Sequence, residues 1–357
     1  MRNKLKALQL FLIKGKIIRK DIENHLCISK MGVSKIVKTL IDDGIVCETE
    51  VKDTKVVGKK AKYLQLNRDN FRKILCIYFG ADSISFAIGD IEENIKVLDK
   101  IDIDENTDIL NVVVERVEKY ISLYEIMIVS IGVNNFQGAR IKKAIEERFK
   151  ITCVVENGVN LIALSQIDEE KKECVIVVNV ENGVEATIVY FDRNSNKKVF
   201  STKEIGHIPF DYSEEAPVCL CGNKGCFETV MSDCQIENQI NNKVEGKYTY
   251  EDIVKKANSN EDNFRAEVMK MIVPLSHIIL WLDTLVNPAK IVITGKITLL
   301  DDFFWNELKK SLVSSSLKNN EINVDKAFYN GDLILKGALK YGIENLINTE
   351  YLKNMLG

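Results

Sequence analysis

The sequence predicts an α/β protein in which an N-terminal winged helix-turn-helix precedes a body of two related α/β lobes. Three observations support this fold class. The first 68 residues carry 16 Lys and Arg against 7 Asp and Glu, a net charge of +9 that leaves −12 for the remainder. Those residues read as three amphipathic helices followed by two alternating strands. Beyond them, buried strands and helices alternate in two successive sets.

The overall composition favours a cytoplasmic globular protein with no membrane partner. A chain of 357 residues, 46% hydrophobic and 28% charged, is too long for one compact core and has an ordinary globular balance. Charged or polar residues interrupt every apolar run before the ~18 residues that a membrane span requires. Lys4, Lys6 and Lys14 break up the start too strongly for a signal peptide. In a reducing cytoplasm, the nine cysteines favour metal binding over disulfides.

The head is expected to hold three helices and two strands in that order. Residues 3–13 place leucines and a phenylalanine on one helical face, and a second helix over 19–26 turns Ile22 and Leu26 inward. Ser29 can cap a third helix because its hydroxyl accepts a hydrogen bond from a free amide of the first turn. Gly44 ends that helix. Two alternating strands follow at 45–51 and 61–66, around a polar turn that forms the wing.

The exposed face of the third helix is the predicted contact with double-stranded DNA. Short polar and cationic side chains on this face suit phosphates and base edges in the major groove, and lysines on the wing can reach phosphate or the minor groove. The positive charge of the head fits the same polyanionic partner. The candidate residues are Ser29, Lys30, Ser34, Lys35, Lys38, Lys59 and Lys60. The alternatives are a protein-interaction module and a basic solvated arm.

The body is divided into a first lobe, residues 69–172, and a second lobe, residues 173–331, while 1–68 form the head. A C-terminal helix near 332–357 is expected to join the first lobe. Expected strands of the first lobe lie at 73–80, 83–91, 126–133 and 152–156, with helices at 108–122 and 139–149. Expected elements of the second lobe are strands at 173–180, 185–192, 197–205 and 290–295, with helices at 249–258 and 263–286.

A short segment of the second lobe carries three cysteines and two glycines, namely Cys219, Cys221, Gly222, Gly225 and Cys226. The glycines let the backbone curl so that three sulfurs face one point. Three thiolates and one imidazole make a closed tetrahedral Zn²⁺ site with a structural role, and His207 is the natural fourth ligand. The alternative is three reduced cysteines without metal. The six scattered cysteines and His277 are expected to be mostly buried core residues.

Residues 204–228, EIGHIPFDYSEEAPVCLCGNKGCFE, resemble the signature of the ROK family of repressors, uncharacterised reading frames and sugar kinases. The pattern is E-x-G-H, about ten residues, then C-x-C-G-x-x-G-C-x-E. VENGVNLIAL (155–164), LVNPAKIVITG (285–295) and the head extend the similarity over essentially the whole chain. The resemblance implies an actin-like, ribonuclease H-like pair of lobes around a sugar cleft, and it points to the repressor branch that includes xylose and N-acetylglucosamine repressors.

The resemblance also implies a site for a small carbohydrate at Asn157, Glu204, His207 and Glu228. Carboxylates and a metal-oriented imidazole suit sugar hydroxyls because they accept or donate hydrogen bonds in fixed directions. Alternatively, Glu204 and Glu228 only support the zinc ligands. The segment between strand and helix around Asn134 and Asn135 is shorter than in the family. The alternatives are therefore a more open cleft, a cleft that binds a ligand other than a hexose, and a cleft that binds no ligand.

Residues that sugar phosphorylation requires are missing, so we expect no catalytic residue and no enzyme. Gly158 stands where the family has its catalytic Asp, and glycine cannot accept a proton. The first phosphate loop, D-x-G-G-T in the kinases, reads YFGAD at 78–82. The second reads ENGVEAT, where Glu181 and Glu185 would repel phosphates. The late strand keeps only one glycine, in Thr294-Gly295-Lys296.

These features predict a sugar-responsive transcriptional regulator, a repressor in the first instance, with xylose metabolism as the expected setting. Its head would bind operator DNA as a homodimer or a dimer of dimers, and its catalytically dead body would sense the sugar. A second hypothesis is a DNA-binding regulator whose body has lost sugar binding and acts only in oligomerisation or protein interaction. A third is a kinase with an accessory head, which the missing base disfavours.

Overall fold

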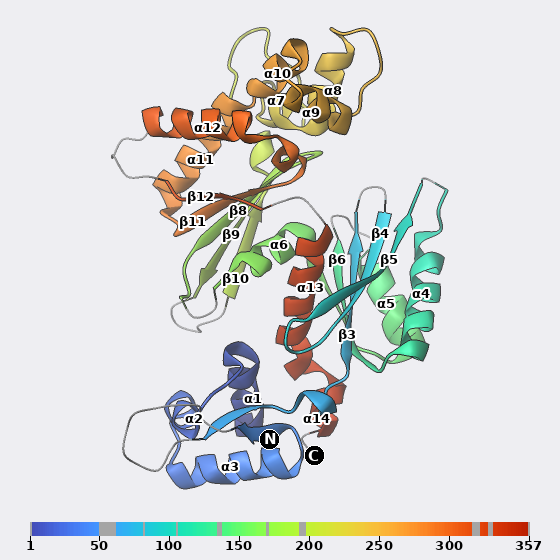
Figure 1. Cartoon of the computed structure of the whole chain (residues 1–357), viewed down its shortest axis with the longest axis vertical. Helices are drawn as coiled ribbons and strands as arrows, with labels where there is room; N and C mark the ends of the chain where they lie inside the picture. Colours follow the sequence, from blue (N-terminus) through green and yellow to red (C-terminus); the bar gives the residue numbers. More distant parts are fainter. Residues whose placement is uncertain are drawn as a thin grey trace. The chain divides into compact units, whose positions relative to one another are not determined.

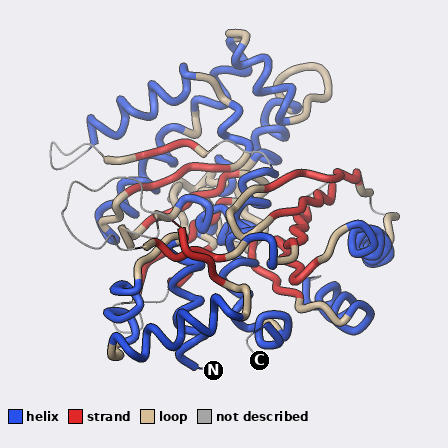
Figure 2. The backbone as a smooth tube through the Cα atoms, turned by 60° about the horizontal axis from the view of Figure 1, so that its bottom comes forward, coloured by secondary structure: helices blue, strands red, loops and turns tan. Residues whose placement is uncertain are grey.

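The computed structural model describes residues 2–49, 62–80, 83–104, 106–133, 138–168, 171–192, 198–315, 322–327 and 331–355 (Figure 1). The chain forms two compact units, one of Met1–Ser165 with Gly331–Gly357 and one of Gln166–Asn330. Each unit has its own sheet with helices packed against it, and the first unit also contains the head. Figure 2 distinguishes the helices, strands and loops along the backbone. The predicted α/β architecture is therefore confirmed.

The head has the predicted order of elements, which are α1 (Arg2–Lys14), α2 (Arg19–Leu26), α3 (Lys30–Asp42), β1 (Val46–Thr49) and β2 (Tyr63–Leu66). The two strands pair antiparallel, with Val46 opposite Leu66. Leu8, Phe11, Ile22 and Val37 are buried at the centre of the head, whereas Leu26 is only partly buried. The wing turn at 52–54, with Lys59 and Lys60, lies outside the described residues.

The first lobe is built on a five-stranded mixed sheet of order β5-β4-β3-β6-β7. Its strands are β3 (Lys73–Phe79), β4 (Ser83–Gly89), β5 (Ile95–Asp102), β6 (Ile126–Val133) and β7 (Cys153–Asn157). β3, β4 and β5 pair antiparallel, whereas β3, β6 and β7 pair parallel. Its helices are α4 (Ile109–Leu123), α5 (Gly138–Phe149), α6 (Gly158–Gln166), α13 (Gly331–Asn345) and α14 (Glu350–Met355).

Helices α4 and α5 cover one face of this sheet, and α13, which comes from the C-terminal part of the chain, also packs against it. Val113 and Val117 of α4 and Ile141 and Ile145 of α5 share one core with the buried side chains of β3, β4 and β6. α13 packs against β3 and β6, where Gly337 is required because a Cβ there would lie 1.9 Å from the carbonyl oxygen of Leu161.

The second lobe repeats the strand arrangement of the first, in the order β10-β9-β8-β11-β12. Its strands are β8 (Val175–Val180), β9 (Val184–Phe191), β10 (Lys198–Lys203), β11 (Lys290–Thr294) and β12 (Val324–Lys326). Three strands again pair antiparallel and three parallel, which agrees with two related lobes. Its α-helices are α7 (Glu228–Met231), α8 (Asp233–Asn241), α9 (Tyr250–Asn258), α10 (Asp262–Met269), α11 (Ile272–Val286) and α12 (Asp302–Ser315).

The prediction of one helix over 263–286 is wrong, because α10 ends at Met269 and α11 begins at Ile272. Pro274 has no N–H for the carbonyl of Lys270, and its ring would clash with that carbonyl in a continuous helix. By length and composition, the stretch Asp262–Val286 could cross a membrane. Leu275, Ile278 and Ile279 are, however, buried in the core of the second lobe, as expected of a core helix.

The C-terminal region is also two helices rather than one, and the second of them holds the segment between head and body. The hydroxyl of Tyr351 on α14 donates to the carbonyl of Asn70 (2.8 Å) and accepts from the amide of Arg72 (3.2 Å). The guanidinium of Arg72 lies over the Tyr351 ring at 5.4 Å. The side-chain amide of Asn70 in turn donates to the carbonyl of Gly44, just beyond α3 (2.7 Å). A chain of contacts thus joins α14 to the end of α3.

Candidate functional site

The predicted metal ligands meet in the second lobe. The ligand atoms of His207, Cys219, Cys221 and Cys226 all lie within 4.8 Å of one another, so this cluster could hold a metal ion. The Sγ atoms of Cys221 and Cys226 are 3.7 Å apart, and Nδ1 of His207 is 3.5 Å from Sγ of Cys219. A tetrahedral zinc with Zn–S bonds of about 2.3 Å and a Zn–N bond of about 2.0 Å gives edges of about 3.8 Å and 3.5 Å. The four residues therefore fit Zn²⁺.

The backbone between Cys219 and Cys226 curls at the two predicted glycines. Gly222 and Gly225 have φ values of 91° and 67°, in the left-handed region that favours glycine. A Cβ on Gly225 would lie 1.8 Å from the carbonyl oxygen of Asp211, so no other residue fits there. The amide of Cys219 donates to the carbonyl of Asn223 at 2.8 Å, which closes the turn around the cysteines.

The environments of the thiols differ. Hydrogen bonding, first to the backbone of Asn223, lowers the pKa of Cys221, whereas burial raises the pKa of Cys226 to about 12. A bound divalent cation reverses the second effect, because a coordinating thiol loses its proton. Nε2 of His207 lies 3.6 Å from Oε2 of Glu204, so that carboxylate can orient the imidazole while Nδ1 faces the sulfurs.

The expectation that the other cysteines and His277 are buried is only partly correct. Cys76 and Cys153 are buried, but Cys27 and Cys234 are exposed, and Cys47 and Cys174 are intermediate. His277 is exposed on α11 and contacts the rings of Phe210 and Trp281. An apolar run in the sequence does not show whether a particular cysteine or histidine within it points into the core or toward solvent. The expected burial was therefore wrong for some of these residues.

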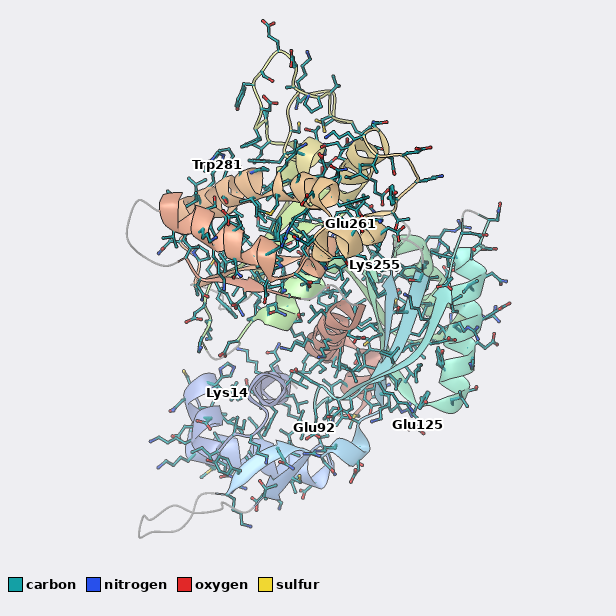
Figure 3. All side chains as sticks on the ribbon, turned by 45° about the horizontal axis from the view of Figure 1, so that its top comes forward. Lys14, Glu92, Glu125, Lys255, Glu261 and Trp281 are labelled. Atoms are coloured by element: carbon teal, nitrogen blue, oxygen red, sulfur yellow. The ribbon has the colours of Figure 1, made fainter. Side chains whose placement is uncertain are left out.

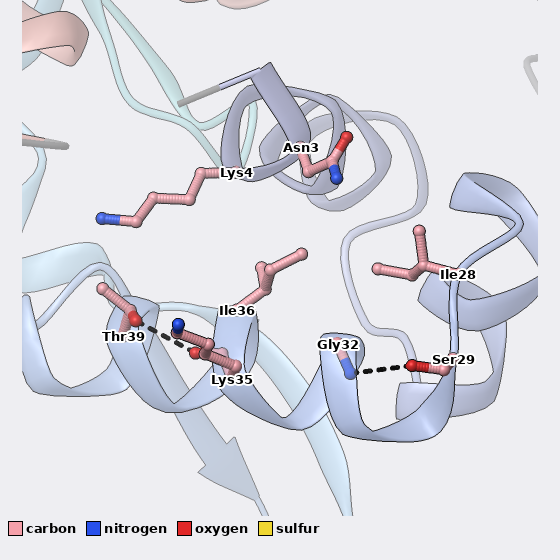
Figure 4. Close-up of a pocket in the computed structure, with 8 residues that line it drawn as sticks. All are labelled: Asn3, Lys4, Ile28, Ser29, Gly32, Lys35, Ile36 and Thr39. Carbon is pink, nitrogen blue, oxygen red and sulfur yellow. Dashed lines mark hydrogen bonds between the residues drawn. The ribbon is translucent and has the colours of Figure 1, made fainter.

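The structure presents the predicted DNA-contacting residues of α3 on one exposed surface. Ser29 caps the helix as expected, since its Oγ accepts from the amide of Gly32 (Figure 4). Ser29, Lys30, Ser34, Lys35 and Lys38 are all exposed. Among the described residues these three lysines make no ion pair, whereas Arg19 and Lys62 both pair with Glu48. The charges of α3 are thus available to phosphate.

This surface includes two further residues, Met31 and Asn3, which the pattern of lysines and serines does not indicate. Met31 is 83% exposed between Lys30 and the next turn of α3, where an apolar side chain can meet a thymine methyl group. Asn3 of α1 lines a pocket together with Ser29, Lys35 and Thr39 of the α3 segment (Figure 4). The sequence does not indicate that Met31 is exposed, and only the structure shows it.

The four residues expected to bind sugar lie in different units. Asn157 belongs to the first unit, where its Oδ1 accepts from the amide of Val159 and caps α6. Glu204, His207 and Glu228 belong to the second unit. Glu204 has a side chain that is 80% exposed, and Glu228 is partly buried at the start of α7, facing Gly183. Asn134 and Asn135 lie outside the described residues.

The turn at 181–187, which the resemblance aligns with the second phosphate loop of the kinases, is acidic. Glu181 is buried, and burial, together with the nearby charges of Glu204 and Glu181, raises the pKa of Glu185. Lys296 follows β11 and lies 3.4 Å from Asp233 and 3.1 Å from Glu251. Burial opposes the charge of Lys296, but the two carboxylates raise its pKa, so its charge is already neutralised locally. Asp82 of the first loop lies outside the described residues.

Fold and sites together define a class of protein. It has a two-lobed α/β body with a Cys₃His cluster, preceded by a three-helix head whose third helix exposes lysines. Residues 74–340 match the model of the ROK family, which is most of the chain. This chain belongs to the ROK family.

Curated relatives are similar over most of their length. The DNA-binding transcriptional dual regulator NagC of Escherichia coli (strain K12) is 26% identical over 351 residues, covering 87% of this chain and 84% of that protein. The xylose repressor of Caldicellulosiruptor bescii is 22% identical over 353 residues, covering 86% of each.

Solved structures share the fold of the whole chain or of most of it. A ROK family transcriptional regulator, a homolog of the E. coli MLC protein, matches with a TM-score of 0.78 and 21% identity over 99% of this chain and 98% of its own. A ROK family glucokinase from Streptomyces griseus, in complex with glucose and AMPPNP, matches with a TM-score of 0.61 and 17% identity over 76% of this chain and 99% of its own. The full-length fold, head included, is therefore that of the first structure.

Proposed function

We propose that this protein is a cytoplasmic, sugar-responsive transcriptional regulator that binds operator DNA as a dimer and acts first as a repressor. The observation that carries the proposal is the row of exposed lysines on α3, which make no ion pair among the described residues, in a chain that matches curated regulators over 84% and 86% of their length. Residues 1–68 would read DNA, and the two lobes, divided near 172, would sense ligand. One Zn²⁺ on His207, Cys219, Cys221 and Cys226 would stabilise the second lobe.

The mechanism requires that the ligand distinguish two arrangements of the protein, because a ligand shifts DNA affinity only through a difference in its own affinity for them. The experiment is to select an operator from random duplexes and to screen monosaccharides and sugar phosphates by thermal shift. Operator binding is then measured by fluorescence anisotropy with and without each hit. A sugar that changes operator affinity supports the sensor; if none does, the regulator whose body serves only oligomerisation or protein interaction takes its place.

Glu228→Gln is expected to raise the effector concentration needed for a half-maximal change in operator binding by about fivefold to tenfold. The substitution replaces a charged acceptor for a sugar hydroxyl with a neutral one, a loss of about 1 kcal/mol. The matched control is Glu215→Gln, which makes the same charge change at an exposed position of the same segment. An unchanged effector response in Glu228→Gln would remove Glu228 from the site.

The protein is expected to have no ATP-dependent kinase activity on xylose, glucose, fructose or N-acetyl sugars. A general base contributes about 10²- to 10⁴-fold, and glycine stands at its position in Gly158. The carboxylates of Glu181 and Glu185 would in addition repel the phosphates. A coupled ADP-release assay measures this, and turnover that a body substitution such as Glu228→Gln abolishes would contradict it.

A further inference from the structure

A row of oxygen-bearing side chains crosses the sheet of the second lobe. Asn179 of β8 pairs in register with Glu185 of β9 on one side and with Thr294 of β11 on the other. Their neighbours along the strands, such as Val178 and Ile293, belong to the core of this lobe. Because successive side chains of a strand point to opposite faces, the three polar side chains share the other face of the sheet. We call these three residues the Asn179 row.

Two oxygen atoms of the Asn179 row are buried and have no hydrogen-bond partner among the described residues. They are Oδ1 of Asn179 and Oγ1 of Thr294, on side chains that are 7% and 1% exposed. The other end of the Asn179 amide faces the carboxylate, since its Nδ2 donates to Oε1 of Glu185 (3.4 Å). Leaving a buried polar atom unsatisfied is costly, and such atoms in a folded protein indicate a bound water or ion. Both oxygens therefore point to a ligand.

The surroundings of Glu185 carry an excess of negative charge. Burial raises the pKa of Glu185, and the charges of Glu204 and Glu181 raise it further. Lys203, the last residue of β10, pairs with Ala186 of β9, so the next residue, Glu204, follows on the side of Glu185. Like charges on neighbouring strands are destabilising. A cation bound at the row would relieve this repulsion.

Within the part of the chain that the structure describes, no lysine or arginine pairs with Glu185. Lys296 follows Thr294 by two residues, but its Nζ lies 3.1 Å from a carboxylate oxygen of Glu251 and 3.4 Å from one of Asp233. Its charge thus serves two other carboxylates. The charge that balances the Asn179 row has to come from a bound ion.

The kind of ion follows from the ligand atoms. Carboxylate, amide and hydroxyl oxygens are hard ligands, which Mg²⁺ and Ca²⁺ prefer, whereas the thiols of the Cys₃His cluster suit Zn²⁺. Neighbouring strands lie about 4.8 Å apart, which is about twice a Ca²⁺–oxygen distance of about 2.3–2.6 Å. One ion can therefore contact oxygens from adjacent strands without a change in the backbone.

We propose that the Asn179 row binds one hard divalent cation, Mg²⁺ or Ca²⁺, through Oδ1 of Asn179, Oγ1 of Thr294 and the carboxylate of Glu185. Water completes the coordination. The site is separate from the Cys₃His cluster and requires neither a nucleotide nor a sugar. Carboxylates that would repel the phosphates of a nucleotide attract a metal ion instead. The proposal goes beyond the regulator function and does not depend on it.

The test titrates the zinc-loaded protein with MgCl₂, CaCl₂ or spermidine by isothermal titration calorimetry. One equivalent of Mg²⁺ or Ca²⁺ should bind to the wild type, and the tighter of the two identifies the ion. Glu185→Gln keeps the shape of the side chain but removes a charged ligand, and it should weaken binding roughly tenfold or more. The control Glu261→Gln removes the same charge at an exposed position of the second lobe, labelled in Figure 3, and should bind like wild type.

Three outcomes overturn the proposal. They are the absence of metal binding by the wild type, equal binding by Glu185→Gln and wild type, and binding of spermidine in preference to both metals. The last outcome would assign the row to an organic amine.

A second measurement uses Thr294→Val, which keeps the shape of the side chain and removes only Oγ1. Saturating ion should raise the melting temperature of the wild type by about 5 °C, and this rise should fall by more than half in the variant. Without the ion the variant should melt at the same temperature as wild type or higher, because it no longer buries an unpaired hydroxyl. A rise as large as that of wild type counts against the site. Neither measurement involves DNA or sugar, so failure of the ion site and failure of the regulator function are distinguishable.

Discussion

Cys221→Ser is expected to reduce bound zinc from about one equivalent per chain to near zero. Serine is not a zinc ligand at neutral pH, and three remaining ligands leave the closed site open to water. Because metal binding to such a site contributes directly to folding, the melting temperature of the second lobe should fall by about 10 °C or more. Metal analysis by plasma mass spectrometry and a thermal melt measure the two effects.

The position makes the experiment selective. Cys221 is exposed, so its replacement removes no buried packing, unlike replacement of Cys226. Cys234→Ser is the matched control, since Cys234 is an exposed cysteine of the same lobe outside the cluster. Full zinc in Cys221→Ser, or equal loss in both variants, would refute the assignment of the four ligands.

Lys35→Ala and Lys38→Ala should each weaken operator binding about tenfold at physiological salt. Each lost phosphate contact also lowers the slope of log K against log salt by about 0.9. Ser34→Ala should alter sequence preference more than the slope, if Ser34 meets a base edge. Anisotropy titrations from low to high salt give both the affinity and the slope.

The control for charge is Lys143→Ala on α5, where a lysine whose side chain is 75% exposed is removed from the body instead of the head. That variant should bind operator like the wild type. If the two α3 variants bind as tightly as wild type at every salt concentration, the face of α3 does not contact DNA, and the function proposed for the head is wrong.

Local signals predicted the parts of the sites that are close in sequence. Ser29 and Gly44 delimit α3 because a cap and a left-handed glycine act within one helical turn. The cysteine segment is equally local: its three thiols lie within eight residues, and only His207 has to be brought in. The sequence therefore predicted the fold class, the clustering of His207 with the three cysteines, and the exposed face of α3.

Contacts between distant residues were not predictable in the same way. The apolar run around His277 predicted burial, but hydrophobicity alone does not determine whether a given face is covered by this chain. Pro274 interrupts the expected long helix for a steric reason that an apolar pattern overlooks. The hydrogen bond from Tyr351 to Asn70 joins positions 281 residues apart, and neither residue belongs to a motif.

That hydrogen bond has a consequence for how the protein is made. At about 5–20 residues per second, a ribosome needs roughly 15 to 60 s to travel from Asn70 to Tyr351. The helices and strands of the head pack on one another, so they can begin to fold early in translation. At that stage neither α13, which α1 contacts, nor α14, which fixes Asn70 and through it the end of α3, yet exists. We therefore expect the head to be attached to the body only after α13 and α14 have been translated, since these two helices supply its contacts with the C-terminal region.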